Sequence, residues 1–313
     1  VHPEVVRVFG HLRTGRQGDA VELARTYAEA KPDVFRWTVL GGTYETTSDF
    51  GNARRAYEHA IELGPDDPAP NVALARLDFG AGRIPDAIGR LERVVTRHPR
   101  HVPALTQLGT FLFSSVNQND GIVYLERAST LQPRNVPLRL MLAERYLTMG
   151  RPDATGVHAE EVLRVTPRNE TAHALLAQAL ARVGQGDLAR ETLRKWTRVA
   201  PDSIAAWQAL GMAATRARDR PGAARAFERV LTLQPAHDAA RFALGQIALD
   251  ESRFDDALAQ ARSIQRLNPR SALGPILEGD VHMRGEDYER ALASYGEAHA
   301  LTPGTRLVVA MMQ

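Results

Sequence analysis

The sequence predicts an all-α protein, a right-handed α-solenoid of stacked antiparallel helix pairs, and three observations lead to this prediction. The quartet TLQP occurs at Thr130–Pro133 and again at Thr232–Pro235, 102 residues apart, which is three times 34. Prolines recur at the same 34-residue step along almost the whole chain. Between the prolines, apolar residues stand three or four positions apart, which is the spacing of one helix face. One short helical unit is therefore repeated.

The repeat keeps its register without an insertion or a deletion. The prolines are Pro65, Pro99, Pro133, Pro167, Pro201, Pro235, Pro269 and Pro303. Small residues keep the same step at Gly41, Ala75, Gly109, Ala143, Ala177, Gly211, Gly245 and Gly279. A second set of small or short residues follows twelve positions later, at Ala53, Ala87, Gly121, Thr155, Ala189, Ala223, Ala257 and Ala291. Independent domains would not hold such a register.

Each unit is expected to be a helix, a tight turn and a second helix. In the segment 34–67, helical spacing occurs in two runs, Trp37, Leu40, Gly41 and Tyr44, then Ala53, Tyr57 and Ala60. The turn between the runs often carries glycine, as in GAGRIPDA at Gly80–Ala87. The proline that follows the second run prevents that helix from continuing. The small residues would let the two helices approach closely.

These residues resemble the tetratricopeptide repeat, whose signature over 34 residues is W-x2-L-G-x2-Y, A-x3-F and P. The segment from Trp37 to Pro65 follows this pattern, with Tyr57 at the Phe position, and the segment from Trp207 to Pro235 follows most of it. Nine repeats in a single array over 1–305 are expected, at 1–33, 34–67, 68–101, 102–135, 136–169, 170–203, 204–237, 238–271 and 272–305. Residues 306–313 look like the truncated first helix of a further repeat, and their apolar side chains could mediate self-association.

The composition of the chain argues against several kinds of site and partner. The 313 residues include no cysteine, so disulfides and thiolate metal sites are excluded. Arginines are scattered among acidic residues and the formal net charge is +2, so no nucleic-acid-binding face is predicted. No apolar run is long enough to span a bilayer. The chain begins with Val1 rather than Met, and we expect an upstream segment to be missing.

No motif predicts an enzyme, a cofactor or a metal site. GQGDLA at Gly184–Ala189 mimics a dinucleotide fingerprint but follows a predicted helix, whereas the fingerprint requires a preceding strand. His98 and His101 flank a stop proline without a further ligand nearby in sequence. Nucleophile elbows, H-E-x-x-H pairs and Walker loops are absent from the sequence.

The resemblance implies instead a protein or peptide ligand in a concave groove lined by the first helices, at repeat positions 2, 5, 6, 9, 12 and 13. The residues at these positions that we expect in the groove are Phe35, Thr38, Glu45, Val72, Arg76, Phe79, Thr106, Gln107, Thr110, Phe113, Leu140, Met141, Glu144, Gln178, Arg182, Gln208, Met212, Arg216, Phe242, Gln246 and Asp280. Gln178, Arg182, Gln208, Met212, Arg216 and Gln246 form the patch to test first. Arg216 could alternatively pair with Asp250 one repeat further on.

A narrower resemblance concerns the late repeats, SALGPILEGDVHMRGEDYERALASYGEAHALTPGTRLVVAM. This stretch is similar to bacterial exported tetratricopeptide lipoproteins that accompany exosortase (PEP-CTERM) and exopolysaccharide systems. The resemblance implies a periplasmic or envelope scaffold, with a cytoplasmic location as the alternative. Two other functions stay open: a regulatory or targeting region of a longer chain with an enzymatic domain elsewhere, and a self-assembling structural array.

One part of the array departs from the repeat pattern. The turn at 116–121 reads VNQNDG, and Gly156 falls within a predicted second helix, where glycine costs about 1 kcal/mol relative to alanine. We expect a joint of low stability near residues 116–160.

Overall fold

The computed structural model describes residues 2–115 and 117–302, and it divides into two compact units. Unit 1 is Val1–Arg145 and unit 2 is Tyr146–Gln313. The boundary falls inside the segment 116–160, in which we expect low stability; that stability stays a prediction. The expected truncated helix at 306–313 lies outside the described residues.

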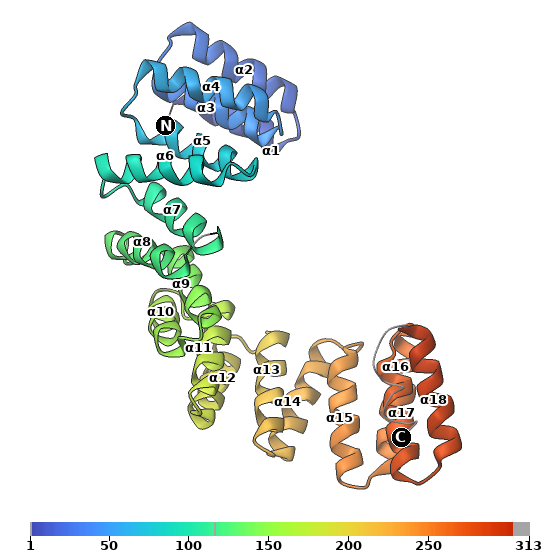
Figure 1. The fold of residues 1–313 in the computed structure, drawn as a ribbon. Coiled ribbons are helices and arrows are strands. Elements are labelled where there is room, and N and C mark those ends of the chain that lie inside the picture. Colours follow the sequence, from blue (N-terminus) through green and yellow to red (C-terminus); the bar gives the residue numbers. More distant parts are fainter. Residues whose placement is uncertain (1, 116, 303–313) are drawn as a thin grey trace. The chain divides into compact units, whose positions relative to one another are not determined.

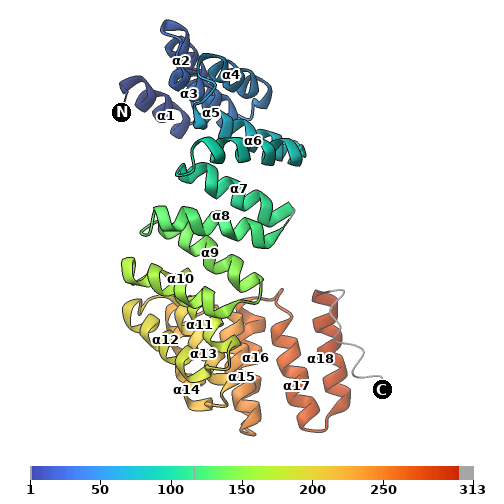
Figure 2. The same ribbon diagram turned by 60° about the vertical axis from the view of Figure 1, so that its left-hand side comes forward.

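The described part of the chain is all-α, as predicted, and it contains eighteen helices (Figures 1 and 2). Unit 1 holds α1 (Pro3–Arg13), α2 (Gln17–Ala30), α3 (Val34–Thr46), α4 (Phe50–Leu63), α5 (Pro68–Gly80), α6 (Ile84–Arg97), α7 (Val102–Ser115), α8 (Gln118–Leu131) and most of α9 (Val136–Thr148). Unit 2 holds the end of α9 and then α10 (Pro152–Val165), α11 (Glu170–Arg182), α12 (Gly186–Val199), α13 (Ile204–Arg216), α14 (Arg220–Leu233), α15 (Asp238–Asp250), α16 (Phe254–Leu267), α17 (Leu273–Arg284) and α18 (Tyr288–Leu301).

Each of the nine expected repeat intervals contains one pair of helices, a first helix with an odd number and a second helix with an even number. Within unit 1, α1 packs on α3, α3 on α5 and α5 on α7, while second helices such as α4 pack between consecutive first helices. Within unit 2, α11 packs on α13 and α15 on α17 in the same way. First helices therefore form one surface of each unit, the first-helix face, and second helices form the other, the second-helix face.

Each first helix from α3 to α15 begins at a capping side chain that recurs every 34 residues. The side chains at these positions accept a hydrogen bond from a backbone N–H of the first helical turn; they belong to Asp33, Asp67, His101, Asn135, Asn169, Ser203 and His237. Such caps satisfy donors that have no partner inside the helix. From Pro65 to Pro235, each stop proline follows the end of one helix, and the cap two residues later begins the next.

The turns inside the repeats depend on a residue with positive φ, again at a fixed repeat position. Among the described turns this residue is glycine in four, with φ of 70–78° at Gly15, Gly82, Gly150 and Gly184. It is not glycine at Ser48, Arg218, Ser252 and Glu286, where φ is 57–63°. Side chains other than glycine adopt this region at a cost of about 1 kcal/mol or more. The sequence predicted glycine in these turns, but what the turns share is a residue with positive φ, whether or not it is glycine.

Small residues at the eighth repeat position make room for the second helix of the same repeat. A Cβ atom on Gly211 would lie 2.8 Å from the Phe227 ring, and one on Gly279 would lie 2.7 Å from the Tyr295 ring. A Cβ atom on Gly41 would likewise collide with the ring of Tyr57. An aromatic ring at position 24 therefore packs on the backbone of position 8.

Donors at the fourth repeat position bind the carbonyl oxygen of the preceding stop proline. The Trp207 indole donates to the carbonyl of Pro201 at 3.0 Å, and the His173 ring lies 2.9 Å from the carbonyl of Pro167. The guanidinium groups of Arg139 and Arg241 make the same contact with Pro133 and Pro235. Carbonyl groups just past the helix end are thereby paired with side chains of the next first helix.

Candidate peptide-binding grooves

The first-helix face of unit 1 carries a groove of about 710 Å³ between α1, α3 and α5. It contains five of the residues expected there: Phe35, Thr38, Glu45, Val72 and Arg76. Phe9 of α1, which the sequence reasoning did not include, also lines it and is 56% exposed, close to the 55% of Phe35. We call this the unit 1 groove.

Charge in the unit 1 groove is neutralised internally. The Arg76 guanidinium donates to both carboxylate oxygens of Glu45, each at 2.7 Å, and the Tyr57 hydroxyl donates to the same carboxylate at 2.9 Å. Burial raises the pKa of Glu45, but the hydrogen bonds from Arg76 and Tyr57 outweigh it and hold the pKa below its usual range. Burial, together with the Glu45 charge, raises the pKa of the Tyr57 hydroxyl. Arg76 already has a carboxylate partner, as a bidentate pair.

Other expected groove residues of unit 1 pack on neighbouring helices. The rings of Phe79 and Phe111 stack with centroids 3.8 Å apart and 9° between their planes. Phe113 is buried, with the Arg145 guanidinium 4.6 Å from its ring centroid.

The other six expected groove residues of unit 1 lie on α7 and α9: Thr106, Gln107, Thr110, Leu140, Met141 and Glu144. The Met141 sulfur lies 3.7 Å from the Thr110 hydroxyl, which donates to it. Gln107 is half-buried and Glu144 is exposed.

The first-helix face of unit 2 carries a groove of about 390 Å³ between α11, α12 and α13. We call it the unit 2 groove. Its floor consists of small apolar side chains with one leucine: Ala174, Ala177, Ala181, Ala189, Ala209, Ala213 and Leu193. Its other lining residues are four members of the expected patch, Gln178, Arg182, Met212 and Arg216. The structure therefore places these four side chains in one groove.

Neither arginine of the unit 2 groove forms an ion pair within the described chain. Arg182 donates to the backbone carbonyl of Leu147 at 2.7 Å, and Arg216 is exposed. The alternative pairing of Arg216 with Asp250 is wrong, because Asp250 lies 3.6 Å from Arg220 and 3.8 Å from Arg284 instead. The groove thus combines an apolar floor with two cations that lack a carboxylate partner.

The other expected groove residues of unit 2 lie outside this groove. Gln246 of α15 donates to the Asp280 carboxylate, which also accepts from the Tyr295 hydroxyl at 2.6 Å. Gln208 of α13 and Phe242 of α15 are half-buried.

Sequence reasoning did not include the alanine floor. Ala174 and Ala181 stand at groove positions 5 and 12, and Ala209 stands at position 6. The repeat positions of these alanines therefore indicated the floor.

Other candidate sites in the described chain have structural roles. The His98 ring contacts the carbonyl of Asp66 at 2.7 Å, and His101 caps α7. In residues 2–115 and 117–302, three or more His, Asp or Glu side chains do not gather as a metal-binding group. Across the same residues, no helix is both long enough and apolar enough to traverse a bilayer.

Comparisons with known proteins agree with this architecture. Two family models, each described as tetratricopeptide repeat, match residues 47–110, 150–213 and 209–272, which together cover more than half of the chain. Superkiller complex protein 3 from Mus musculus is 29% identical over 100 residues, which are 32% of this chain and 6% of that protein. The chain thus spans a small part of this curated relative.

Solved structures of low sequence identity share the fold. The C-terminal part of a TPR repeat-containing protein from Cytophaga hutchinsonii aligns with a TM-score of 0.61 at 16% identity, over 77% of this chain and 99% of that one. PilW, described as a widely conserved type IV pilus biogenesis factor, aligns with a TM-score of 0.52 at 16% identity, over 68% of this chain and 98% of that one. A tetratricopeptide repeat protein from Parabacteroides merdae aligns with a TM-score of 0.50 at 14% identity, over 77% of this chain and 95% of that one.

Proposed function

Because the chain belongs to the tetratricopeptide repeat family, we propose that it is a non-catalytic scaffold that binds a peptide segment of a partner protein in the unit 2 groove. The observation that carries the proposal is the alanine floor beside Arg182 and Arg216, two cations without a carboxylate partner. Peptide recognition needs a surface that can accept side chains together with polar groups that fix their orientation.

The lining of the groove specifies the peptide. Alanine side chains leave space that larger residues would fill, so the floor can accept small or medium apolar side chains. Met212 is 44% exposed, and its flexible thioether can adapt to such a side chain. The planar guanidinium groups of Arg182 and Arg216 suit a carboxylate. The ligand we propose is therefore an extended segment with an apolar side chain next to an acidic one.

Peptide selection tests this proposal. A random short-peptide library would be selected on the immobilised chain, and the affinity of the recovered peptides would be measured by fluorescence anisotropy. We expect the double variant Arg182→Gln/Arg216→Gln to bind them at least about tenfold more weakly, because a lost charge contact in a partly buried groove costs more than 1 kcal/mol.

The matched control is Arg76→Gln in the unit 1 groove, where the arginine is already paired with Glu45. Equal affinity of the wild type and the double variant would refute the role of the unit 2 groove. An equal loss of affinity in Arg76→Gln would also refute it.

A more specific proposal places this scaffold in the bacterial periplasm or envelope, in exopolysaccharide export or protein sorting. Its support is the similarity of the stretch around repeat 272–305 to exported lipoproteins. Fractionation of the source cells with an antibody against the chain tests it, and recovery in the cytosolic fraction would contradict it.

A further inference from the structure

The second-helix face of unit 2 carries a pocket of about 420 Å³ between α12 and α14, with α13 beneath. Four arginines line it, Arg190 and Arg194 from α12 and Arg225 and Arg229 from α14. Each pair is separated by four residues, so both side chains of a pair lie on the same helix face. We call this the arginine pocket.

Positive charge in the arginine pocket is in excess. The guanidinium groups of Arg194 and Arg225 form no ion pair with residues that the structure describes, and both side chains are exposed. Arg229 donates to the carbonyl of Pro201 at 3.4 Å, which leaves its charge without a carboxylate. The single acidic residue in the lining, Asp219, caps α14 through the backbone N–H of Gly222 at 2.9 Å.

Arg190 adds a donor that has no acceptor. It pairs with Asp187, but its Nε atom is buried and makes no hydrogen bond in the described chain. A buried N–H without an acceptor is costly, so the Arg190 side chain gains when it turns this donor toward a ligand carboxylate.

The remaining lining of the pocket is apolar. Leu210 and Ala214 of α13 and Ala226 of α14 contribute aliphatic surface, and the half-buried Trp207 contributes its ring. The hydrogen bond from its indole to the Pro201 carbonyl fixes the position of that ring. An inorganic anion would use the arginines but none of this apolar surface.

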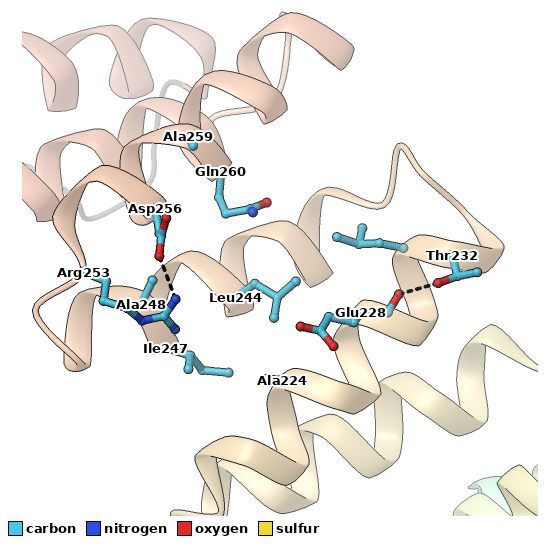
Figure 3. Close-up of a pocket in the computed structure, with 11 residues that line it drawn as sticks. Ala224, Glu228, Thr232, Leu244, Ile247, Ala248, Arg253, Asp256, Ala259 and Gln260 are labelled. Atoms are coloured by element: carbon cyan, nitrogen blue, oxygen red, sulfur yellow. Dashed lines mark hydrogen bonds and ion pairs between the residues drawn. The ribbon is translucent and has the colours of Figure 1, made fainter.

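A neighbouring pocket on the same face of unit 2 shows that the charge excess is local. The pocket of about 470 Å³ between α14 and α16 contains Glu228 and Asp256 with a single arginine, Arg253 (Figure 3). This arginine is neutralised, because it lies 2.7 Å from Asp256 (Figure 3) and 2.7 Å from Glu251. The stacking of repeats therefore does not by itself produce a cationic pocket.

We propose that the arginine pocket is a second binding site, on the face opposite to the unit 2 groove, and that it binds an acidic protein segment. Glutamate or aspartate side chains of the segment would contact Arg194, Arg225 and, once its side chain has turned, Arg190. An apolar residue between them would pack on Trp207. The opposite charges would also accelerate association, and salt would weaken it.

The experiment uses a labelled synthetic peptide in which glutamates flank leucines, and a control peptide with glutamine in place of each glutamate. Binding is measured by anisotropy at low salt, on the chain that carries Arg182→Gln and Arg216→Gln, so that the unit 2 groove cannot contribute. We expect Arg194→Gln/Arg225→Gln in this background to weaken binding at least about tenfold. The matched control is Arg262→Gln/Arg266→Gln on α16, which removes two exposed arginines outside the pocket and should leave binding unchanged.

A second readout locates the peptide. The chain has three tryptophans, and the indole N–H signal of Trp207 should shift in nitrogen–proton spectra while that of Trp37 in unit 1 stays in place. Three results would overturn the proposal. The glutamine peptide could bind as tightly as the glutamate peptide, or the two double variants could lose the same affinity. The third is a Trp207 signal that shifts with inorganic phosphate but not with the peptide. The background variant makes these outcomes independent of the unit 2 groove.

Discussion

The two first-helix grooves use arginine in opposite ways. In the unit 1 groove, Arg76 is bound by the carboxylate of Glu45, which lies one repeat earlier. In the unit 2 groove, Arg182 and Arg216 have no carboxylate partner in the described chain. The difference teaches that an arginine at a groove position can serve the fold or a ligand, and that an acidic residue from the adjacent repeat decides between these roles.

The two units also differ in the burial of a carboxylate that pairs with more than one arginine. In unit 1, the Asp78 side chain is 3% exposed and lies among three arginines, Arg54, Arg83 and Arg90. In unit 2, Asp250 also serves two arginines, but it is 50% exposed and its ion pairs are 3.6 and 3.8 Å long. Removal of one partner from a buried cluster is costly, whereas surface pairs contribute little.

The largest effect should therefore follow from the removal of the buried charge in unit 1. We expect Asp78→Asn to lower the free energy of unfolding by about 3 kcal/mol, because three arginines would lose their shared carboxylate. The matched change Asp250→Asn in unit 2 should cost less than about 1 kcal/mol. Urea unfolding monitored by circular dichroism measures both, and equal losses would contradict the contrast between the units.

A second contrast concerns glycines at the eighth repeat position. A Cβ atom on Gly109 of unit 1 would lie 2.7 Å from the backbone oxygen of Gly121, whereas one on Gly211 of unit 2 would meet the ring of Phe227 at 2.8 Å. Backbone yields less readily than a side chain, so we expect Gly109→Ala to cost about 3 kcal/mol and Gly211→Ala about 1 kcal/mol.

The control for these two variants is Gly10→Ala in α1, where a Cβ atom has no neighbour within 4 Å. This change should stabilise the chain by about 0.5–1 kcal/mol, since alanine is the better helix former. Thermal unfolding of the three variants should preserve this order.

Acid should destabilise unit 1 through its paired carboxylates. Burial raises the pKa of Asp78, but hydrogen bonds from Arg54 and Arg83 hold it below its ordinary value, and Arg76 and Tyr57 do the same for Glu45. A folded-state pKa below the unfolded value stabilises the protein above the unfolded pKa of about 4, and this contribution disappears as the pH falls further. Hydrogen exchange as a function of pH should show protection lost in α3–α6 below about pH 4, and less so in Asp78→Asn. Constant protection in α3–α6 down to about pH 3 would contradict this.

The smallest expected effect comes from the turns. Residues 146–302 of unit 2 contain three turns in which a residue other than glycine has positive φ, at Arg218, Ser252 and Glu286. We expect Arg218→Gly and Ser252→Gly each to stabilise the chain by about 0.5–1 kcal/mol, because glycine adopts this conformation without steric cost. Differential scanning calorimetry measures the gain, and Gly184→Ala should give the opposite sign.

Much of the fold could be predicted from sequence, because the repeat makes one local pattern recur. The proline step predicted where second helices end from Pro65 onward, since proline in a helix interior ends the helix. The caps were equally readable, at Asp33 directly after Pro32 and at its equivalents two positions after each proline from Pro65 to Pro235. The positive φ at Arg218 was not, because its residue type gives no sign of a left-handed conformation.

The candidate site was less predictable. Repeat positions placed Gln178, Arg182, Met212 and Arg216 in one groove. They could not show that Glu45 neutralises Arg76, because the partner of a long side chain depends on packing between repeats. The arginine pocket could not be predicted for a related reason. Its four arginines come from α12 and α14, which belong to different repeats and meet only through the packing of α13.

The binding of an acidic peptide in the unit 2 groove is tested most directly by methyl nuclear magnetic resonance of the six methionines. A peptide recovered by selection is titrated into the chain labelled at its methionine methyl groups. The Met212 signal should shift in proportion to occupancy, while the signal of Met149, in the turn between α9 and α10, should stay in place. A bound peptide that leaves the Met212 signal unchanged would contradict the account.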